Sequence, residues 1–278
     1  MASMLCAKFA EIFLVDYLLY IKPQKGDGDM TADEYLYSII KKYAVNVSAA
    51  EAAANSLVPT INAWGGNLIV GKQFSGSLAK GTAVSLATDA DIFVSLSSTT
   101  TNTLKEIYNT LYDALSGAGY SPRKQNVSIG VTVNGYKVDV VPGKRQSQQG
   151  NDHSLYKNRQ NTWTKTNIDT HINLVQKSNR LNEIKVLKIW KKLHSLEFPS
   201  FFLEMAAMDA LKGARGTLSQ NVWTVLTFLR DNIETICYID PANTNNTISD
   251  DCTKVEKTQI SNSAKNSLAK KTWEEIVW

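Results

Sequence analysis

An Asn-Gly pair between two alternating apolar runs restricts the fold of this chain more than any other feature. The runs are residues 127–133 and 136–141, and Asn134-Gly135 separates them. Such a pair is the strongest short-range signal for a two-residue β-hairpin. In that hairpin Gly130 lies opposite Asp139, on the face that does not carry the large apolar residues. We therefore predict one core face and one polar face, on which the glycine leaves room beside the Asp139 carboxylate.

Two more aspartates precede the hairpin, in a segment typical of a β-strand. Asp89 and Asp91 are two positions apart, so the period of two directs both carboxylates to one face. Phosphoryl chemistry commonly uses two metal ions about 3.5–4 Å apart, and Mg²⁺ takes oxygen ligands from a few carboxylates and from substrate phosphates. A solvated surface position is the other interpretation for any single aspartate. Together with Asp139, the pair predicts a catalytic site for two Mg²⁺ or Mn²⁺ ions.

A short glycine-serine segment further upstream is typical of a phosphate cradle. Gly76-Ser77 stands where a turn would open a short helix, and Lys80 follows three residues later. The free N–H groups and the positive dipole end of such a helix suit a triphosphate. The lysine lies on the wrong side of the serine for a P-loop, whose order is GxxxxGK[ST]. We therefore predict that the segment binds nucleotide phosphates without being a P-loop.

The composition restricts the compartment and the partners. With 30 Lys plus Arg against 26 Asp plus Glu, the 278 residues carry a net charge of +4, which gives no indication that a long nucleic acid is required. The three cysteines are far apart in the chain, which favours a reduced, cytoplasmic compartment. The apolar residues 12–21 fall well short of the roughly 20 that span a membrane, so we expect no membrane partner.

The order of the elements predicts an α+β protein. Thr31, with Glu34 as its capping-box partner, marks a helix start, so we interpret residues 1–29 as an N-terminal extension or as the product of an upstream start codon. Residues 143–161 are basic and rich in glutamine, which indicates a loop over the site. Helical periodicity and end signals predict helices at residues 32–43, 48–64, 104–116, 182–196, 218–238 and 253–276.

The motifs around the three aspartates resemble a known family of enzymes. They are similar to nucleotidyltransferases such as oligoadenylate synthase, cyclic GMP-AMP synthase and archaeal CCA-adding enzymes, and most of all to bacterial CD-NTases of the CdnE type. The resemblance rests on Gly76-Ser77, Lys80-Gly81-Thr82, Asp89-Ala90-Asp91 and Val138-Asp139-Val140-Val141-Pro142.

The resemblance implies a fold and a division of the chain. It covers residues 30–278 and implies a polymerase-beta-like core with a mixed β-sheet and helices at 30–165. A helical lobe would follow at 166–278, with the active-site cleft between the two. Gly76 and Ser77 would hold the donor triphosphate, and Asp139 would lie nearest the attacking 3′-hydroxyl.

The resemblance also implies roles in the helical half. Asn167 lies at the helix entrance that contributes to the acceptor-base pocket, where asparagine goes with uridine use in CdnE-type enzymes. Lys188 matches a lysine that contacts the triphosphate, although lysines on such helices are usually solvated. Ser200 lies in a segment similar to the family's Pro-Ser and Leu-Glu pattern, and its other interpretation is a helix N-cap. Asn246 lies in a loop similar to one near the donor nucleotide, which by chemistry alone is equally a turn.

The function implied by the resemblance is the synthesis of cyclic di- or trinucleotide second messengers in bacterial anti-phage (CBASS) signalling. The substrates would be ATP and UTP or another NTP, and an effector protein encoded nearby would sense the product. One alternative is an RNA-extending enzyme of the CCA-adding or poly(A) kind, which needs an RNA-docking surface that a short chain of mild charge has little room for. The other is a catalytically quiet nucleotide-binding sensor, against which the three intact aspartates argue.

Overall fold

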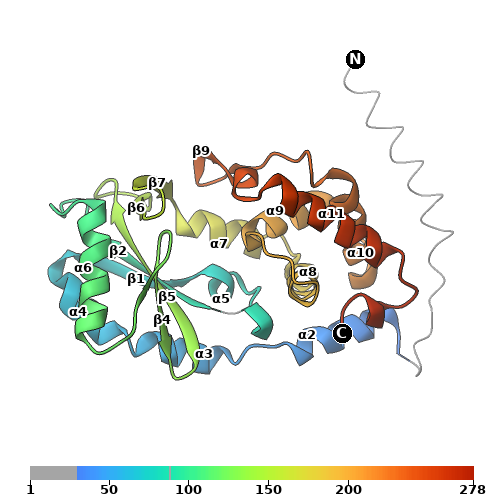
Figure 1. Ribbon diagram of the computed structural model, residues 1–278, viewed down its shortest axis with the longest axis horizontal. Coiled ribbons are helices and arrows are strands. Elements are labelled where there is room, and N and C mark those ends of the chain that lie inside the picture. The colour runs from blue at the N-terminus through green and yellow to red at the C-terminus, as the bar shows by residue number, and fades with distance from the viewer. Residues whose placement is uncertain (1–29, 88) are drawn as a thin grey trace, which may run out of the picture.

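One seven-stranded mixed sheet dominates the first half of the protein (Figure 1). A computed structural model describes residues 30–87 and 89–278, so the predicted extension at 1–29 lies outside the described residues. The main path of the sheet is β1-β2-β5-β4-β3, with β6 and β7 continuing from β5. Only the central pair, β2 and β5, runs parallel among the described strands. The strands are β1 (Ile69–Ser75), β2 (Ala90–Leu96), β3 (Arg123–Lys124), β4 (Ile129–Val133), β5 (Tyr136–Arg145), β6 (His153–Lys157) and β7 (Thr162–Thr166), and β8 (Ile239–Asp240) pairs separately with β9 (Asn243–Thr247).

Helices cover one face of this sheet and build the second half of the protein. In Figure 1, α7 lies between the sheet and the group of helices α8 to α11. No helix of the described residues is both long and apolar enough to cross a membrane. The helices are α2 (Ala32–Lys42), α3 (Val47–Asn55), α4 (Val58–Gly65), α5 (Gly76–Lys80), α6 (Leu104–Gly117), α7 (Ile168–Gln176), α8 (Leu181–Leu193), α9 (Ser200–Ala210), α10 (Leu218–Asn232) and α11 (Lys254–Leu268).

The protein has two hydrophobic cores. The first core packs α3, α4 and α6 against the sheet, through buried residues such as Leu111 and Val140. The second core gathers α8 to α11 around the fully buried Trp190, and Leu36 and Ile39 of α2 belong to it. The first helix was expected in the catalytic core at 30–165, whereas its buried residues complete the helical core. The division of the chain at residue 165 itself stays a prediction.

The predicted hairpin is confirmed in position and register. Asn134 and Gly135 both have positive φ, at 50° and 81°, as a type I′ turn requires. Val133 pairs with Tyr136, and Gly130 pairs with Asp139. The alternating pattern was sufficient because a slip of one residue would turn every apolar side chain of this hairpin to the wrong face.

The helix predicted at 48–64 is two helices. Pro59 lies in the first turn of α4, where its missing N–H costs nothing, but the same residue cannot continue the helix before it. The chain therefore turns between Asn55 and Val58.

The loop predicted at 143–161 is also wrong. β5 runs on to Arg145, and β6 and β7 form a further hairpin. Leu155 and Tyr156 of β6 are buried, and the Tyr156 hydroxyl donates to Asn161 Oδ1 at 2.7 Å in the turn. His153 of the same strand is buried as well, with its ring centre 4.8 Å from that of Phe93, so a strand with few large apolar residues still packs against the sheet.

Several helix ends differ from the prediction, while the clearest cap agrees with it. The backbone N–H of Thr31 donates to Glu34 Oε2 at 2.7 Å, and the Glu34 N–H donates to Thr31 Oγ1 at 3.3 Å, so the capping box is confirmed. The helix predicted at 218–238 ends at Asn232, the one predicted at 182–196 ends at Leu193, and the tail helix ends at Leu268. Apolar periodicity continues beyond these ends because the following turns still bury apolar residues such as Ile233 and Ile276.

Candidate active site

Four strand positions at one level of the sheet form the centre of the site. Ser75 of β1 pairs with Asp91 of β2, Asp91 pairs with Asp139 of β5, and Asp139 pairs with Gly130 of β4. Neighbouring strands lie about 4.8 Å apart, so the Asp91 and Asp139 side chains leave adjacent strands on the same face. This level is where the parallel strand pair meets the start of α5.

Gly76 brings its backbone directly against the Asp91 carboxylate. Its φ is +59°, and a Cβ atom at this position would lie 1.8 Å from Asp91 Oδ2. No side chain fits there, and α5 begins at this residue without a capping bond from the Ser75 side chain. The first N–H groups of a helix have no partner within the helix, so Gly76 and Ser77 present free amide donors beside the aspartates.

Two side chains that the sequence did not reveal hold the Asp139 carboxylate. Gln125 Nε2 donates to Asp139 Oδ1 at 2.7 Å, and Ser128 Oγ donates to Oδ2 at 3.4 Å. Tyr108 fixes this turn in place because its hydroxyl donates to the Gln125 carbonyl at 2.7 Å. No sequence motif marks Gln125 and Ser128, which lie just before β4. The short pairing of β3 with β4 places them next to Gly130.

Burial and neighbouring charges raise the pKa of Asp91 and Asp139. Burial raises the pKa of Asp91 to about 7, and the charges of Asp139 and Asp89 add to the shift. Burial and the Asp89 charge also raise the pKa of Asp139, against the opposing hydrogen bonds from Gln125 and Ser128. The positive charges of Lys80 and Lys188 act on Asp91 in the opposite direction. The three carboxylates therefore form a site that a positive charge would stabilise.

The donor chemistry of the aspartates fits Mg²⁺. All three candidate ligands are carboxylates, as hard cations prefer, and Asp91 and Asp139 project from paired positions. Among residues 30–87 and 89–278, no three His, Cys, Asp or Glu side chains are grouped closely enough to hold an ion as they stand. Like charges disfavour close approach, and the charges of Asp139 and Asp89 contribute, after burial, to the raised pKa of Asp91.

Lys80 and Lys188 lie on the helical side of the aspartates. Lys80 Nζ forms an ion pair with Glu204 Oε2 at 2.8 Å and lies 4.4 Å from the centre of the Phe201 ring. Lys188 is 2% exposed and forms no hydrogen bond or ion pair with the residues that the structure describes. Burial lowers the pKa of its ammonium group, while Glu204 and Asp91 oppose this shift.

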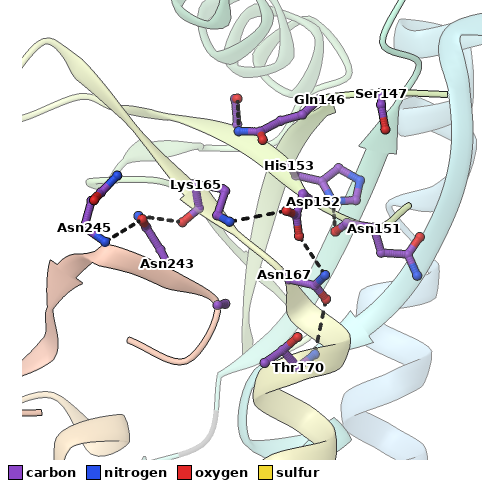
Figure 2. A network of polar contacts seen from close by, with 12 residues as sticks. Gln146, Ser147, Asn151, Asp152, His153, Lys165, Asn167, Thr170, Asn243 and Asn245 are labelled. Atoms are coloured by element: carbon purple, nitrogen blue, oxygen red, sulfur yellow. Dashed lines mark hydrogen bonds and ion pairs between the residues drawn. The ribbon is translucent and has the colours of Figure 1, made fainter. Parts of the chain in front are cut away.

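Asn167 belongs to a polar network of its own, shown in Figure 2. It is the N-cap of α7, where its Oδ1 accepts from the Thr170 N–H at 3.2 Å. Its Nδ2 donates to Asp152 Oδ1 at 2.9 Å, and Lys165 forms an ion pair with the same Asp152 at 3.3 Å. Asn167 also lines a cavity of about 890 Å³ along α7, together with Asn151, Asp169, Asn173 and other residues.

The last two candidates occupy separate positions. Ser200 is not the predicted N-cap, because α9 begins at this residue and Pro199 is the N-cap. Pro199 takes the N-cap position because its ring fixes φ near the −60° that it has in this extended backbone. Asn246 Nδ2 donates to Asp240 Oδ2 at 3.2 Å, and the other oxygen of Asp240 pairs with His171 at 2.7 Å. The loop therefore reaches α7, next to the site.

Comparison with protein families identifies the first half of the chain. Residues 30–179 match the model of the Second Messenger Oligonucleotide or Dinucleotide Synthetase domain (SMODS). No curated protein matches the chain. The predicted resemblance to the CD-NTases is thereby confirmed at the level of the family.

Solved structures share the fold over most of the chain. CdnC of E. coli MS115-1 with ATP is 20% identical with a TM-score of 0.67, over 85% of this chain and 90% of that one. CdnG of Bradyrhizobium diazoefficiens in complex with GTP is 13% identical with a TM-score of 0.71, over 86% and 91%. The Cid1 poly(U) polymerase bound to MgATP is 12% identical with a TM-score of 0.63, over 85% and 93%.

These likenesses confirm the predicted α+β, polymerase-beta-like fold with its mixed sheet and helices. The identities are too low to select a subtype, so the CdnE type stays a prediction. The family match covers the cradle, the aspartates and α7. The chain belongs to the family of second messenger oligonucleotide or dinucleotide synthetase domains, and it is a nucleotidyltransferase of the CD-NTase kind.

Proposed function

We propose that this protein joins NTPs into cyclic di- or trinucleotide second messengers, in a reaction that depends on Mg²⁺. The observation that carries the proposal is the alignment of Asp91 and Asp139 on paired strands, with the Gly76 backbone against one carboxylate. In our proposal the product acts in bacterial anti-phage signalling in the cytoplasm, where an effector protein binds it.

The chain's own groups divide the reaction between them. The amides of Gly76 and Ser77, with Lys188, bind the donor triphosphate, and Asp89, Asp91 and Asp139 hold the ions. When bound, Mg²⁺ supplies charge stabilisation and lowers the pKa of the attacking hydroxyl. Asp139, oriented by Gln125 and Ser128, faces the hydroxyl that attacks the α-phosphate, and pyrophosphate leaves. Positioning and charge stabilisation account for most of the catalysis.

Terminal transfer to RNA is the second candidate. The fold of the Cid1 poly(U) polymerase supports it, because the same sheet and helical lobe serve an RNA-extending enzyme. The family match favours the cyclic product, and a net charge of +4 provides little general attraction for a long RNA. A catalytically quiet nucleotide-binding sensor is the third candidate. The paired, buried carboxylates of Asp91 and Asp139, whose pKa values are raised, support a metal site instead.

A product assay tests the proposal. The protein is incubated with labelled ATP, UTP, GTP and CTP and with Mg²⁺ or Mn²⁺, in the presence and absence of an RNA primer. We expect products that resist phosphatase and form without the primer. The double variant Asp89→Asn/Asp91→Asn serves as the control, and it should lose all synthesis while its circular dichroism stays unchanged. Synthesis retained by that variant, or products formed only on the primer, would contradict the proposal.

A further inference from the structure

Glu204 is a buried carboxylate at the end of the phosphate cradle. It is 1% exposed, and it comes from α9 of the helical lobe. Its two oxygens accept from the Lys80 ammonium at 2.8 Å and from the Thr82 hydroxyl at 3.2 Å. Both donors come from the cradle and the turn after it, so one side chain of the lobe holds the far end of α5.

The same carboxylate compensates more than one positive charge. Lys188 has no ion-pair partner of its own among the described residues, and the Glu204 charge reaches it. Glu204 thus acts on both ammonium groups, and the Asp91 charge acts on them from the sheet side. A buried ammonium group without compensation costs free energy, so Glu204 stabilises the protein before a nucleotide is bound.

Lys80 has two possible partners within reach. It is four residues after Gly76, which corresponds to about 6 Å along the axis of α5, and its charge already acts on Asp91. A triphosphate on the Gly76 and Ser77 amides would bring negative charge into the reach of this long side chain. An ammonium group has three N–H donors, so it can contact both groups, but a phosphate and Glu204 then share its single positive charge and each weakens the attraction of the other.

We propose that Glu204 and the donor phosphates compete for Lys80. Glu204 is then a positioning residue: it holds the lysine before the nucleotide binds and takes it back as pyrophosphate leaves. The inference rests on the proposed function, because it needs the donor triphosphate at the cradle. Its consequence is that Glu204 lowers the affinity of the site for polyphosphates and speeds their release.

Binding of inorganic tripolyphosphate tests the competition. Glu204→Gln keeps the shape and a hydrogen-bond acceptor for Thr82, but it removes the competing charge. We expect this variant to melt at a lower temperature, to bind tripolyphosphate about tenfold more tightly by calorimetry, and to be inhibited more strongly by pyrophosphate. Affinity that is equal or weaker would overturn the proposal.

Glu183→Gln is the matched control. Glu183 is also a buried glutamate of the helical lobe, and it pairs with Arg180 at 3.4 Å and accepts from Asn221 at 2.8 Å. The loss of its charge should lower the melting temperature without changing tripolyphosphate affinity. An equal gain of affinity in both glutamine variants would show a general charge effect and overturn the proposal.

Two further variants keep the test decisive. In a Lys80→Met background the gain from Glu204→Gln should disappear, and a gain that persists would contradict exchange of the lysine. If Glu204→Gln does not fold, Glu204→Asp replaces it, because the shorter side chain lengthens the ion pair with Lys80. We expect this variant to bind tripolyphosphate two- to threefold more tightly. An unchanged affinity would contradict the proposal. If the unchanged protein binds no tripolyphosphate, the proposed function fails as well, whereas normal binding without any variant effect removes this inference alone.

Discussion

The candidate site has two sides whose residues acquire their positions in different ways. The sheet side consists of Asp91 and Asp139, and the helical side consists of Lys80, Lys188 and Glu204. The sheet side is set by register, because paired strand positions place both carboxylates at one level. The helical side is set by contacts of α5 with the later helices α8 and α9, such as the bond from Lys80 to Glu204, 124 positions away. The first arrangement is therefore local and predictable, and the second depends on the assembled cores.

A substitution at Gly76 gives the largest expected effect and tests the sheet side. Gly76→Ala places a methyl group where Asp91 Oδ2 now lies, at 1.8 Å, and the displacement of a catalytic carboxylate by about 1 Å can cost a hundredfold in rate. We expect a loss of at least about a hundredfold in nucleotide incorporation. Steady-state assays with labelled ATP measure it.

Gly213→Ala separates backbone strain from the loss of this contact. Gly213 also has a positive φ, at +76°, but a Cβ atom there meets nothing within 4 Å. Both variants bear the cost of a left-handed alanine, about 1 kcal/mol, and Gly76→Ala adds the clash with Asp91, so its melting temperature should fall further. Equal activities would show that the close approach of Gly76 to Asp91 does not matter.

Removal of Lys188 tests the helical side and has the second-largest effect. Lys188→Met takes away a buried ammonium that has no ion-pair partner among the described residues. We expect kcat/KM for ATP to fall by about tenfold or more, since a charge held next to transferring phosphates stabilises the transition state. Unfolding in urea should show unchanged or higher stability, because burial of an unpaired charge is costly.

Lys185→Met is the control for that variant, because Lys185 lies one turn earlier on α8 and is only partly buried. It should leave the activity unchanged. A Lys188 variant that is less stable and fully active would mean that the lysine is structural.

The contrast between the two sides also explains what sequence reasoning found and missed. The hairpin at Asn134-Gly135, the partnership of Gly130 and Asp139 and the start of α5 at Gly76 follow from short-range rules, and all agree with the structure. Gln125 was not identified, and Glu204 was noted only as part of the Leu-Glu pattern, because their partners come from contacts over the fold, such as the bond from Lys80 to a residue 124 positions away. Lys188 was proposed only from the resemblance, since its burial cannot be derived from a lysine-rich helix.

The strands β6 and β7 show the limit of composition as a guide. Residues 143–161, which include β6, are basic and rich in glutamine. They nevertheless extend the sheet, because the end of β5 pairs with β6 and because Leu155 and Tyr156 are buried. Asn161 adopts a positive φ of 48° in the turn between β6 and β7.

The pH dependence of stability offers a smaller effect that sharpens the comparison on the sheet side. Asp91 has a pKa raised to about 7 in the folded protein, whereas an unfolded aspartate releases its proton near pH 4. The folded state therefore binds more protons between these values, and the free energy of unfolding should fall as the pH rises from about 4 to about 7. Each unit by which the pKa of a group differs between the folded and unfolded states changes the free energy of unfolding by about 1.4 kcal/mol.

Urea unfolding in EDTA at several pH values measures this fall. Asp91→Asn should reduce the slope, and the remainder belongs to Asp139, whose pKa is raised as well. Asp113→Asn, at an exposed position on α6, is the control and should keep the slope. A slope that is the same in all three proteins would contradict the electrostatic account of the aspartates.

The smallest expected effect concerns the choice of base at Asn167. Its amide is held at both ends, by the Thr170 N–H and by Asp152, so it is a rigid group on the wall of the cavity along α7. Asn167→Ser keeps an N-cap for α7 but removes the amide, so the helix should persist while the ratio of UTP to GTP incorporation shifts several-fold toward GTP. Asn173→Ser, one turn and a half further along the same cavity wall, should leave the ratio unchanged, since position 173 is not tied to Asp152. If both variants keep the ratio of UTP to GTP incorporation, base selection does not depend on Asn167. The helical side would then bind the donor phosphates through its positive charges without selecting the acceptor base.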